Sequence, residues 1–446
     1  MNAIPSRYLD SETTDPDAVM RKIILRIVPL LFACYVLNFL DRINVGFAQL
    51  QMKQDLGFSD AVYGLGAGLF FIGYFFFEVP SNLLLEKIGA RKTMLRIMVL
   101  WGLASAGTMF VQTPHQFYII RFLLGLFEAG FFPGMILYLT FWTPASYRAR
   151  VIALFMTALL VAGVIAGPVS GLILQSMNGV GGLRGWQWMF LLGGLPSCAL
   201  GVMVYVFLDD RPRDAKWLTE IEKRFLSTTL ANEAAAGGGA TAGTTNLRQT
   251  FTEPLVYLFA FTYFAILAGA FVIAFWMPIF IRERGVSNLF EVGLYSAIPY
   301  TVAVVVMLLV SRHSDARNER RWHIAAPAIV GAIALILLPQ ATQSLAQTMV
   351  LLTVMTAGLC SCLPNFWSFV TVSLPQSVSS GGIAIIASMG NLAGFVSPLI
   401  IGRIRAESGS TTSGIYLMGA IVLTGMVLML LATRRHTSTM PARVSP

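Results

Sequence analysis

Twelve long apolar stretches run through the sequence, and they constrain the fold more than any other feature. Each is long enough for a helix to cross membrane hydrocarbon, which takes roughly 20 residues. Such segments must be helices because lipid offers the backbone no hydrogen-bond partner. Only 12% of the 446 residues are charged, whereas soluble domains carry about a quarter. The sequence therefore predicts an all-α integral membrane protein with spans at about 23–48, 61–85, 93–112, 116–141, 149–175, 187–208, 254–281, 290–311, 323–341, 345–370, 381–402 and 413–433.

The longest polar stretch divides these spans into two sets of six. Its Ala/Gly/Thr run, Ala234–Thr245, cannot build a core and is expected to be flexible. Its segment Asp214–Leu230 has the spacing of a short amphipathic helix, which suits either a lipid surface or a plain linker. Short loops with an acid followed by basic residues, Glu86–Lys92 and Ser314–Arg321, recur at equivalent places and indicate duplicated halves with the substrate between them. The expected organisation is an N-terminal tail (1–22), a six-helix half (23–208), a linker (209–253), a second six-helix half (254–433) and a C-terminal tail (434–446).

The distribution of lysine and arginine predicts the orientation of the chain. Most of them fall in segments on the same side of the spans as both termini, which places both termini in the cytoplasm. This bias also accounts for the net charge of +9, so no nucleic-acid partner is expected. The polar first twenty residues do not form a cleavable signal peptide. We expect a monomeric multi-pass protein of a bacterial inner (plasma) membrane, whose partners are lipid, protons and a small organic anion.

Four charged residues lie within spans of the first half: Asp41 and Arg42, near the outer end of the first span, and Arg121 and Glu128, in the fourth. Charges at membrane depth cost several kcal/mol and are tolerated where they pair or line a water-filled cavity. Arg42 is a permanent cation whose planar fork of donors suits a carboxylate. Without substrate, Asp41 or Glu128 can balance it. A bound substrate carboxylate would free the displaced protein carboxylate to take up a proton. The sequence thus predicts a transporter in which anion and proton uptake are coupled.

Several motifs carry a resemblance to known transporters. The loop Glu86–Lys92, Arg121-x-x-x-Gly125 and Gly163-x-x-x-Gly167-Pro168-x-x-Gly171 resemble motifs of the major facilitator superfamily, with Glu86 in place of the usual Asp. Four further motifs in register resemble its anion:cation symporter family, whose members move organic anions, commonly with protons. They are Tyr35-x-x-Asn38-x-x-Asp41-Arg42-x-Asn44-x-Gly46, Phe77-Glu78-Val79-Pro80-Ser81-Asn82, Glu128-Ala129-Gly130-Phe131-Phe132-Pro133-Gly134 and Asn391-Leu392-Ala393-Gly394-Phe395.

The resemblance implies roles for individual residues. It assigns substrate contact to Arg42, Tyr74, Trp367 and Asn391, and proton coupling to Asp41 and Glu128. Arg121 is expected to be a substrate ligand or a switch partner for the carboxylates. The alternative is a structural network that joins the first and fourth spans, with Asn391 bonded to a neighbouring helix.

A second set of charged residues lies near the ends of the spans. Glu78 and Glu86 are expected to form ion pairs with Arg91, Arg148 or Arg150 that close the cytoplasmic side in the outward-open state. Asp315, in the equivalent loop of the second half, belongs to the same gate or structural set.

The resulting interpretation is a proton-coupled symporter of a small carboxylate, with aromatic and dicarboxylic acids as candidates, that works by alternating access. The apolar run Leu159-Leu160-Val161 in the fifth span argues against a heavily hydroxylated sugar acid. A proton-antiport exporter of the same fold is the alternative. No enzyme, metal site or cofactor is expected: the four cysteines suit small buried residues, and the four histidines lie at or near span ends.

Overall fold

The computed structural model describes residues 15–235, 247–341 and 344–434. Twelve helical segments within these residues are long and apolar enough to cross a membrane. This confirms the predicted all-α fold. The first half contains α1 (Pro16–Leu56), α2 (Asp60–Ile88), α3 (Ala90–Gly107), α4 (Pro114–Glu128), α5 (Phe131–Thr140), α6 (Ala145–Ser176) and α7 (Gly185–Phe207); the second contains α10 (Pro254–Arg282), α11 (Leu289–Arg317), α12 (Arg321–Leu337), α13 (Leu345–Ser373), α14 (Gln376–Asn391), α15 (Ala393–Ser408) and α16 (Thr412–Ala432).

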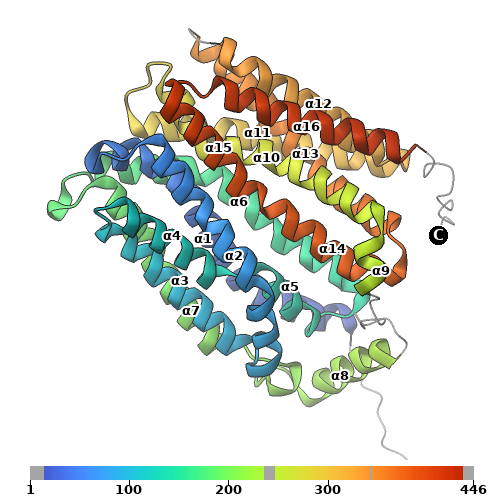
Figure 1. The fold of residues 1–446 in the computed structure, drawn as a ribbon. Coiled ribbons are helices and arrows are strands. Elements are labelled where there is room, and N and C mark those ends of the chain that lie inside the picture. Colours follow the sequence, from blue (N-terminus) through green and yellow to red (C-terminus); the bar gives the residue numbers. More distant parts are fainter. Residues whose placement is uncertain (1–14, 236–246, 342–343, 435–446) are drawn as a thin grey trace, which may run out of the picture.

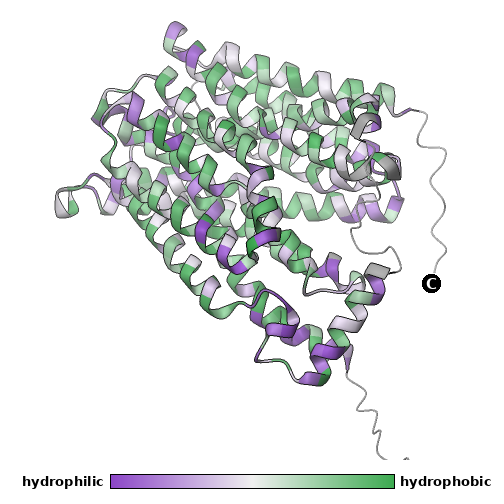
Figure 2. Ribbon diagram, turned by 60° about the horizontal axis from the view of Figure 1, so that its bottom comes forward, coloured by the Kyte–Doolittle hydropathy of each residue, from purple (hydrophilic) through white to green (hydrophobic). Residues whose placement is uncertain are grey.

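The two halves lie side by side, the first in blue to green and the second in yellow to red (Figure 1). Because six spans precede the linker and six follow it, α1 begins and α16 ends on the side where the linker lies. We call this the linker end and the other side the opposite end. Figure 2 shows hydrophobic residues along the helices and hydrophilic residues mainly toward their ends, including α8 at the linker end.

The fourth span differs from the continuous helix predicted over 116–141. It is broken between α4 and α5, directly after Glu128. Pro133 cannot donate a hydrogen bond to the carbonyl of Ala129 four residues earlier, and its ring would clash there. Gly130 takes a left-handed conformation with φ of 84°, and a β-carbon on it would lie 2.7 Å from Ser81 Cβ. The break therefore places the carboxylate of Glu128 at the end of a helix inside the bundle. The eleventh span is interrupted more mildly, between α14 and α15.

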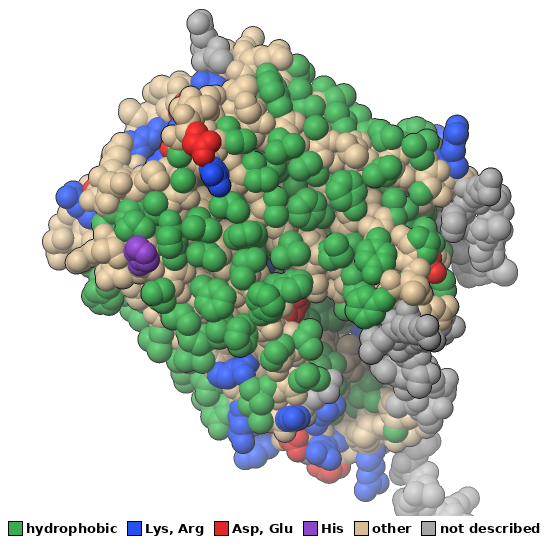
Figure 3. Space-filling view, in the orientation of Figure 1, with side chains coloured by type: hydrophobic (Ala, Val, Ile, Leu, Met, Phe, Trp, Pro, Cys, Tyr) green, Lys and Arg blue, Asp and Glu red, His purple; other side chains and the backbone are tan. Residues whose placement is uncertain are grey.

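The halves contact each other closely toward the opposite end. A β-carbon on Gly64 of α2 would lie 2.3 Å from the carbonyl oxygen of Pro398 of α15, and one on Gly167 of α6 would lie 2.3 Å from that of Gly293 of α11. Glycine is needed at these contacts because the backbones approach too closely for a side chain. Toward the linker end, the surface is hollowed between the halves (Figure 3). The molecule is thus closed at the opposite end and open at the linker end.

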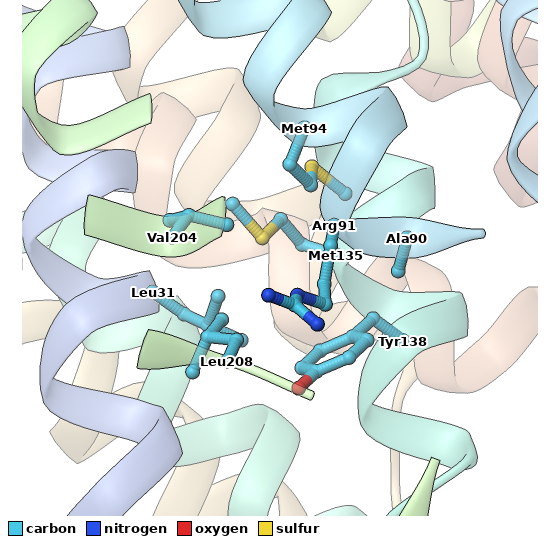
Figure 4. A pocket seen from close by; sticks show the side chains of 8 residues that line it. All are labelled: Leu31, Ala90, Arg91, Met94, Met135, Tyr138, Val204 and Leu208. Atoms are coloured by element: carbon cyan, nitrogen blue, oxygen red, sulfur yellow. The ribbon is translucent and has the colours of Figure 1, made fainter. Parts of the chain in front are cut away.

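The beginning of the linker is bound to the first half. The ring of Trp217 stacks on Trp142 with centroids 5.6 Å apart, and its indole N–H donates to Asp209. The backbone N–H of Arg91 donates to Asp210, while its guanidinium donates to the carbonyl of Tyr205 at 2.9 Å. Figure 4 shows the adjacent small pocket, where the side chains of Arg91 and Tyr138 lie close to Leu208. This part of the linker therefore belongs structurally to the first half.

The amphipathic helix predicted at Asp214–Leu230 begins later, as α8 (Glu220–Ala235), and is followed by the short α9 (Leu247–Thr252). Thr219 sets its start through a reciprocal capping box with Glu222: Glu222 N–H donates to the threonine hydroxyl, and Thr219 N–H donates to the glutamate. α8 packs against protein: Leu226 is fully buried, and Glu222 pairs with Lys22 of α1 at 2.9 Å. The Ala/Gly/Thr run predicted to be flexible lies mostly outside the described residues.

Candidate functional site

The centre of the first half holds an ion pair between α1 and α4. Arg42 Nε lies 2.5 Å from Glu128 Oε1. The Glu128 side chain is fully buried, whereas 26% of the Arg42 side chain is exposed. A buried carboxylate needs a partner of this kind, since removing it from water is costly. Glu128 is therefore held inside the protein, while Arg42 can still be reached by a ligand.

Aromatic rings of α2 hold both arginines in place. The guanidinium carbon of Arg42 lies 4.9 Å from the ring centroid of Tyr74 and 5.4 Å from that of Phe70. The guanidinium carbon of Arg121 lies 5.2 Å from the same Phe70 ring. Phe70 and Tyr74 are one turn apart and therefore share a face of the helix. Cation–π contacts of this kind are strongest where water is excluded.

Arg121 is almost completely buried. Its Nε donates to the carbonyl oxygen of Gly66 at 3.4 Å, and its Nη1 has no hydrogen-bond partner among the described residues. The structure also gives Arg121 no ion pair within the described ranges. A buried guanidinium with an unused donor can accept an additional anionic ligand.

Asp41 points away from its neighbour Arg42 in the sequence. Its Oδ2 accepts a hydrogen bond of 2.9 Å from the indole N–H of Trp101, and its Oδ1 accepts one from the hydroxyl of Ser105. All three residues are buried, and both donors come from α3. Asp41 and Glu128, for which we predict the same role in proton coupling, therefore have different surroundings. One carboxylate bonds neutral donors and the other bonds an arginine.

The two substrate-contact residues predicted in the second half, Trp367 and Asn391, belong to segments that lie against Tyr263 of α10. The ring of Trp367 lies 4.9 Å from that of Tyr263. Asn391 is the last residue of α14, and the preceding Gly390 lies so close to Tyr263 that a β-carbon would be 2.0 Å from its ring. The second half thus contributes an aromatic surface, and none of its described residues is a buried charge.

The predicted gate residues are arranged differently in this state. Glu78 is half-buried and lies within electrostatic range of Arg42, with no ion pair to Arg91, Arg148 or Arg150 in the described chain. Arg148 instead pairs with Glu233 of α8 at 3.5 Å. Arg150 is exposed near the start of α6. The Glu86 side chain lies outside the described residues. Asp315 pairs with Arg320 at 2.5 Å. The gate was predicted for the opposite, outward-open state, so it stays a prediction.

Three residues at the site were missed in the sequence: Trp101, Ser105 and Tyr263. Trp101 and Ser105 are one helical turn apart in an otherwise apolar span, and this spacing places them on one face. This spacing of two polar side chains could have identified both residues from the sequence. Tyr263 stands in an aromatic-rich span and offers no comparable pattern. No group of three or more potential metal ligands occurs among the described residues.

Comparison with known proteins decides the family. The sequence profile of the Major Facilitator Superfamily matches residues 31–398. The chain belongs to this superfamily. A "Putative tartrate transporter" of Agrobacterium vitis is 45% identical over 438 residues, covering 97% of this chain and 95% of the relative. A "Quinolone resistance transporter" of Acinetobacter baumannii is 37% identical over 410 residues, covering 92% and 94%.

Solved structures of the major facilitator superfamily share the fold. An inward-facing, unoccupied bacterial homologue of the human lysosomal transporter Spinster superimposes with a TM-score of 0.75 at 16% identity, covering 96% of this chain and 100% of that one. At this identity the likeness concerns the fold alone. The predicted family is confirmed: the protein is a multi-pass secondary transporter of the major facilitator superfamily and not an enzyme.

Proposed function

We propose that the protein imports a small organic acid together with protons across a bacterial inner membrane. The observation that carries this proposal is the ion pair between Arg42 and Glu128, in which a permanent cation that a ligand can reach holds a fully buried carboxylate. We take the linker end, with both termini, as the cytoplasmic side. The hollow between the halves then opens to the cytoplasm.

The coupling follows from competition for Arg42. A substrate carboxylate that binds the guanidinium fork displaces Glu128. An unpaired carboxylate cannot remain charged at low cost in a buried site, so Glu128 takes up a proton. Proton binding therefore favours substrate binding and the reverse, as linkage requires. Asp41 is the second proton-coupling candidate. Rocking of the halves then moves the loaded site between the two sides.

The arrangement of the arginines favours a dicarboxylate. Arg42 and Arg121 lie against the same Phe70 ring, and Nη1 of Arg121 has an unused donor. One carboxylate could bind each guanidinium, with Tyr74, Trp367 and Asn391 contacting the remainder of the molecule. The relative named as a tartrate transporter supports this class of substrate.

Export by proton antiport is the second candidate, and the relative named as a quinolone resistance transporter favours it. Quinolone carriers act on larger aromatic molecules, and the aromatic surface around Tyr263 would suit such a cargo. The site nevertheless favours the import of an acid, since a reachable arginine, Arg42, and a buried one, Arg121, both recognise anions.

Uptake into proteoliposomes separates the two candidates. The purified protein is reconstituted and offered tartrate, sugar acids, phthalate and hydroxyphenyl acids, with and without an inward proton gradient, while uptake and charge movement are recorded. We expect the gradient to stimulate uptake of a dicarboxylate. If the gradient slows uptake of every acid, or no acid enters, the import proposal is wrong and the exporter remains.

A further inference from the structure

We propose that Trp101 and Ser105 are positioning residues that set the proton affinity of Asp41, with Trp101 stabilising the charged carboxylate and Ser105 able to bond either protonation state. The inference rests on the proposed proton coupling for its role in transport. The bonding itself is independent of the substrate.

The geometry gives each oxygen of Asp41 one dedicated donor. The indole N–H of Trp101 lies 2.9 Å from Oδ2, and the Ser105 hydroxyl donates to Oδ1. Trp101 is fixed from the other side by an edge contact with Phe131, with centroids 5.7 Å apart. Ser105 and Trp101 are fully buried and Asp41 is 1% exposed, so water does not compete for these bonds.

The two donors differ in their chemistry. An indole nitrogen only donates, so its bond to Oδ2 favours the ionised form of Asp41. A hydroxyl both donates and accepts. When Oδ1 is protonated, the Ser105 hydroxyl can accept a hydrogen bond from it. The hydroxyl can then donate its own hydrogen to the backbone carbonyl one turn earlier, a common serine bond in helices. Asp41 can therefore gain and lose a proton at Oδ1 without leaving a buried polar group unsatisfied.

Three charged groups also act on Asp41. Arg42 follows it on α1, and Arg121 and Glu128 face it from α4. On the α7 side, a β-carbon added to Gly193 would lie 3.4 Å from Oδ1 of Asp41. These charges stay in place when Trp101 is changed. A shift in the proton affinity of Asp41 in a Trp101 variant therefore reports the lost hydrogen bond.

The test is the pH dependence of the carboxyl band of Asp41 in infrared difference spectra of the substrate-free protein in lipid nanodiscs. The band is assigned by its loss in Asp41→Asn. In Trp101→Phe, which keeps a ring against Phe131, we expect Asp41 to protonate at a pH about one to two units higher, because the ionised carboxylate loses a charge-assisted hydrogen bond. Trp186→Phe is the matched control, because it removes an equivalent 2.9 Å indole bond to Asp55.

Ser105 variants provide a second measurement. Ser105→Thr keeps the hydroxyl and should leave the midpoint close to that of the wild type. Ser105→Ala should raise it less than Trp101→Phe does, because Ser105 can bond both protonation states of Asp41. The proposal is overturned if Trp101→Phe leaves the midpoint unchanged, if Trp186→Phe shifts it equally, or if no Asp41-dependent band titrates while the protein is folded. If the proposed symport itself fails, wild-type uptake shows no response to a proton gradient although the infrared shift persists.

Discussion

Arg405 of α15 joins Asp60 of α2 across the opposite end of the molecule, with 3.5 Å between Nε and Oδ2. The same guanidinium donates to Glu283 at 2.6 Å, and Asp60 also binds Lys53 of α1. Asp60 and Lys53 belong to the first half and Arg405 and Glu283 to the second. This cluster therefore ties the halves together on the side where the molecule is closed.

Arg405→Gln should shift the protein toward the state open at this end. Only the pair with Asp60 crosses the halves, and its loss, at about 0.5–1 kcal/mol, changes the balance of states by roughly two- to fivefold. The measurement is labelling of Ala67→Cys by an impermeant maleimide in a background without native cysteines. Ala67 is buried on α2 and lies one turn from Gly64 and Phe71, which both contact the second half. Arg403→Gln breaks an exposed pair with Glu407 on the same helix and serves as the control. Equal labelling in both variants would contradict a locking role for Arg405.

Gly167→Ala should hinder closure at the opposite end while leaving each half folded. The added methyl group would lie 2.3 Å from the carbonyl oxygen of Gly293 in the other half. Gly125→Ala is the informative comparison, because its methyl group would lie 1.9 Å from the carbonyl oxygen of Phe70 within the first half. We expect Gly167→Ala to raise maleimide labelling with little change in melting temperature, and Gly125→Ala to lower the melting temperature. If Gly167→Ala instead lowered the melting temperature without raising labelling, the Gly167 contact would stabilise the fold and would not control opening.

Arg42→Lys should weaken substrate binding by about 10–100-fold, which corresponds to the loss of one charge-assisted hydrogen bond. An ammonium cannot reproduce the two parallel bonds of the guanidinium fork. Affinity is measured by isothermal titration calorimetry with the acid identified in the uptake assay. Arg284→Lys, which changes an arginine bonded to Thr348 at the opposite end, is the control. Affinity kept within about threefold of the wild type, less than 1 kcal/mol, would move the carboxylate contact to another residue.

Glu128→Gln should abolish proton-driven accumulation and preserve exchange of substrate across the membrane. The amide is neutral at every pH, so Arg42 is permanently available and proton uptake at this site is lost. Accumulation against a gradient and counterflow are measured in the same vesicles. Glu233→Gln, at the linker end, is the control. Accumulation that survives in Glu128→Gln would leave Asp41 as the sole coupling residue.

Docking of α8 should weaken in acid. Partial burial raises the pKa of Glu222, but hydrogen bonds from Lys22 and Thr219 outweigh it and hold the pKa below its ordinary value of 4.5. The stabilisation is therefore complete above that value and is lost as the pH falls through the lowered pKa. Hydrogen-exchange protection of α8 should be constant near neutral pH and fall in acid. Lys22→Ala should reduce the protection already at neutral pH, whereas Lys223→Ala, which removes a pair within α8, should not.

Much of the fold could be predicted because lipid imposes strict rules on sequence. Hydropathy and length located the twelve spans, and the charged residues within those spans, Asp41, Arg42, Arg121 and Glu128, marked the site. The break after Glu128 was not predicted, although Pro133 and Gly130 are its physical causes. In the sequence both residues belong to the motif Glu128–Gly134, and membrane-spanning helices often contain proline and glycine without breaking.

Pairings between distant segments were harder to predict. Nothing in the sequence indicates that Asp41 bonds Trp101 while Glu128 bonds Arg42, since both depend on how α1 is rotated between α3 and α4. The ion pairs of Arg405 were not predicted either. In the sequence, a positive charge at the end of a span indicates only which side of the membrane that end lies on. Whether such a charge pairs with the other half can be decided only when the packing of the two halves is known.

The uneven distribution of buried charge has a consequence for how such a protein can diversify. Every fully buried charge among the described residues lies in the first half, whereas the second half offers aromatic and apolar surface around Tyr263. Substitutions in the second half can change which substrate fits without altering the buried charges that we propose couple transport to protons. Substrate specificity can therefore change, in evolution or by design, while the buried charged residues of the first half stay the same.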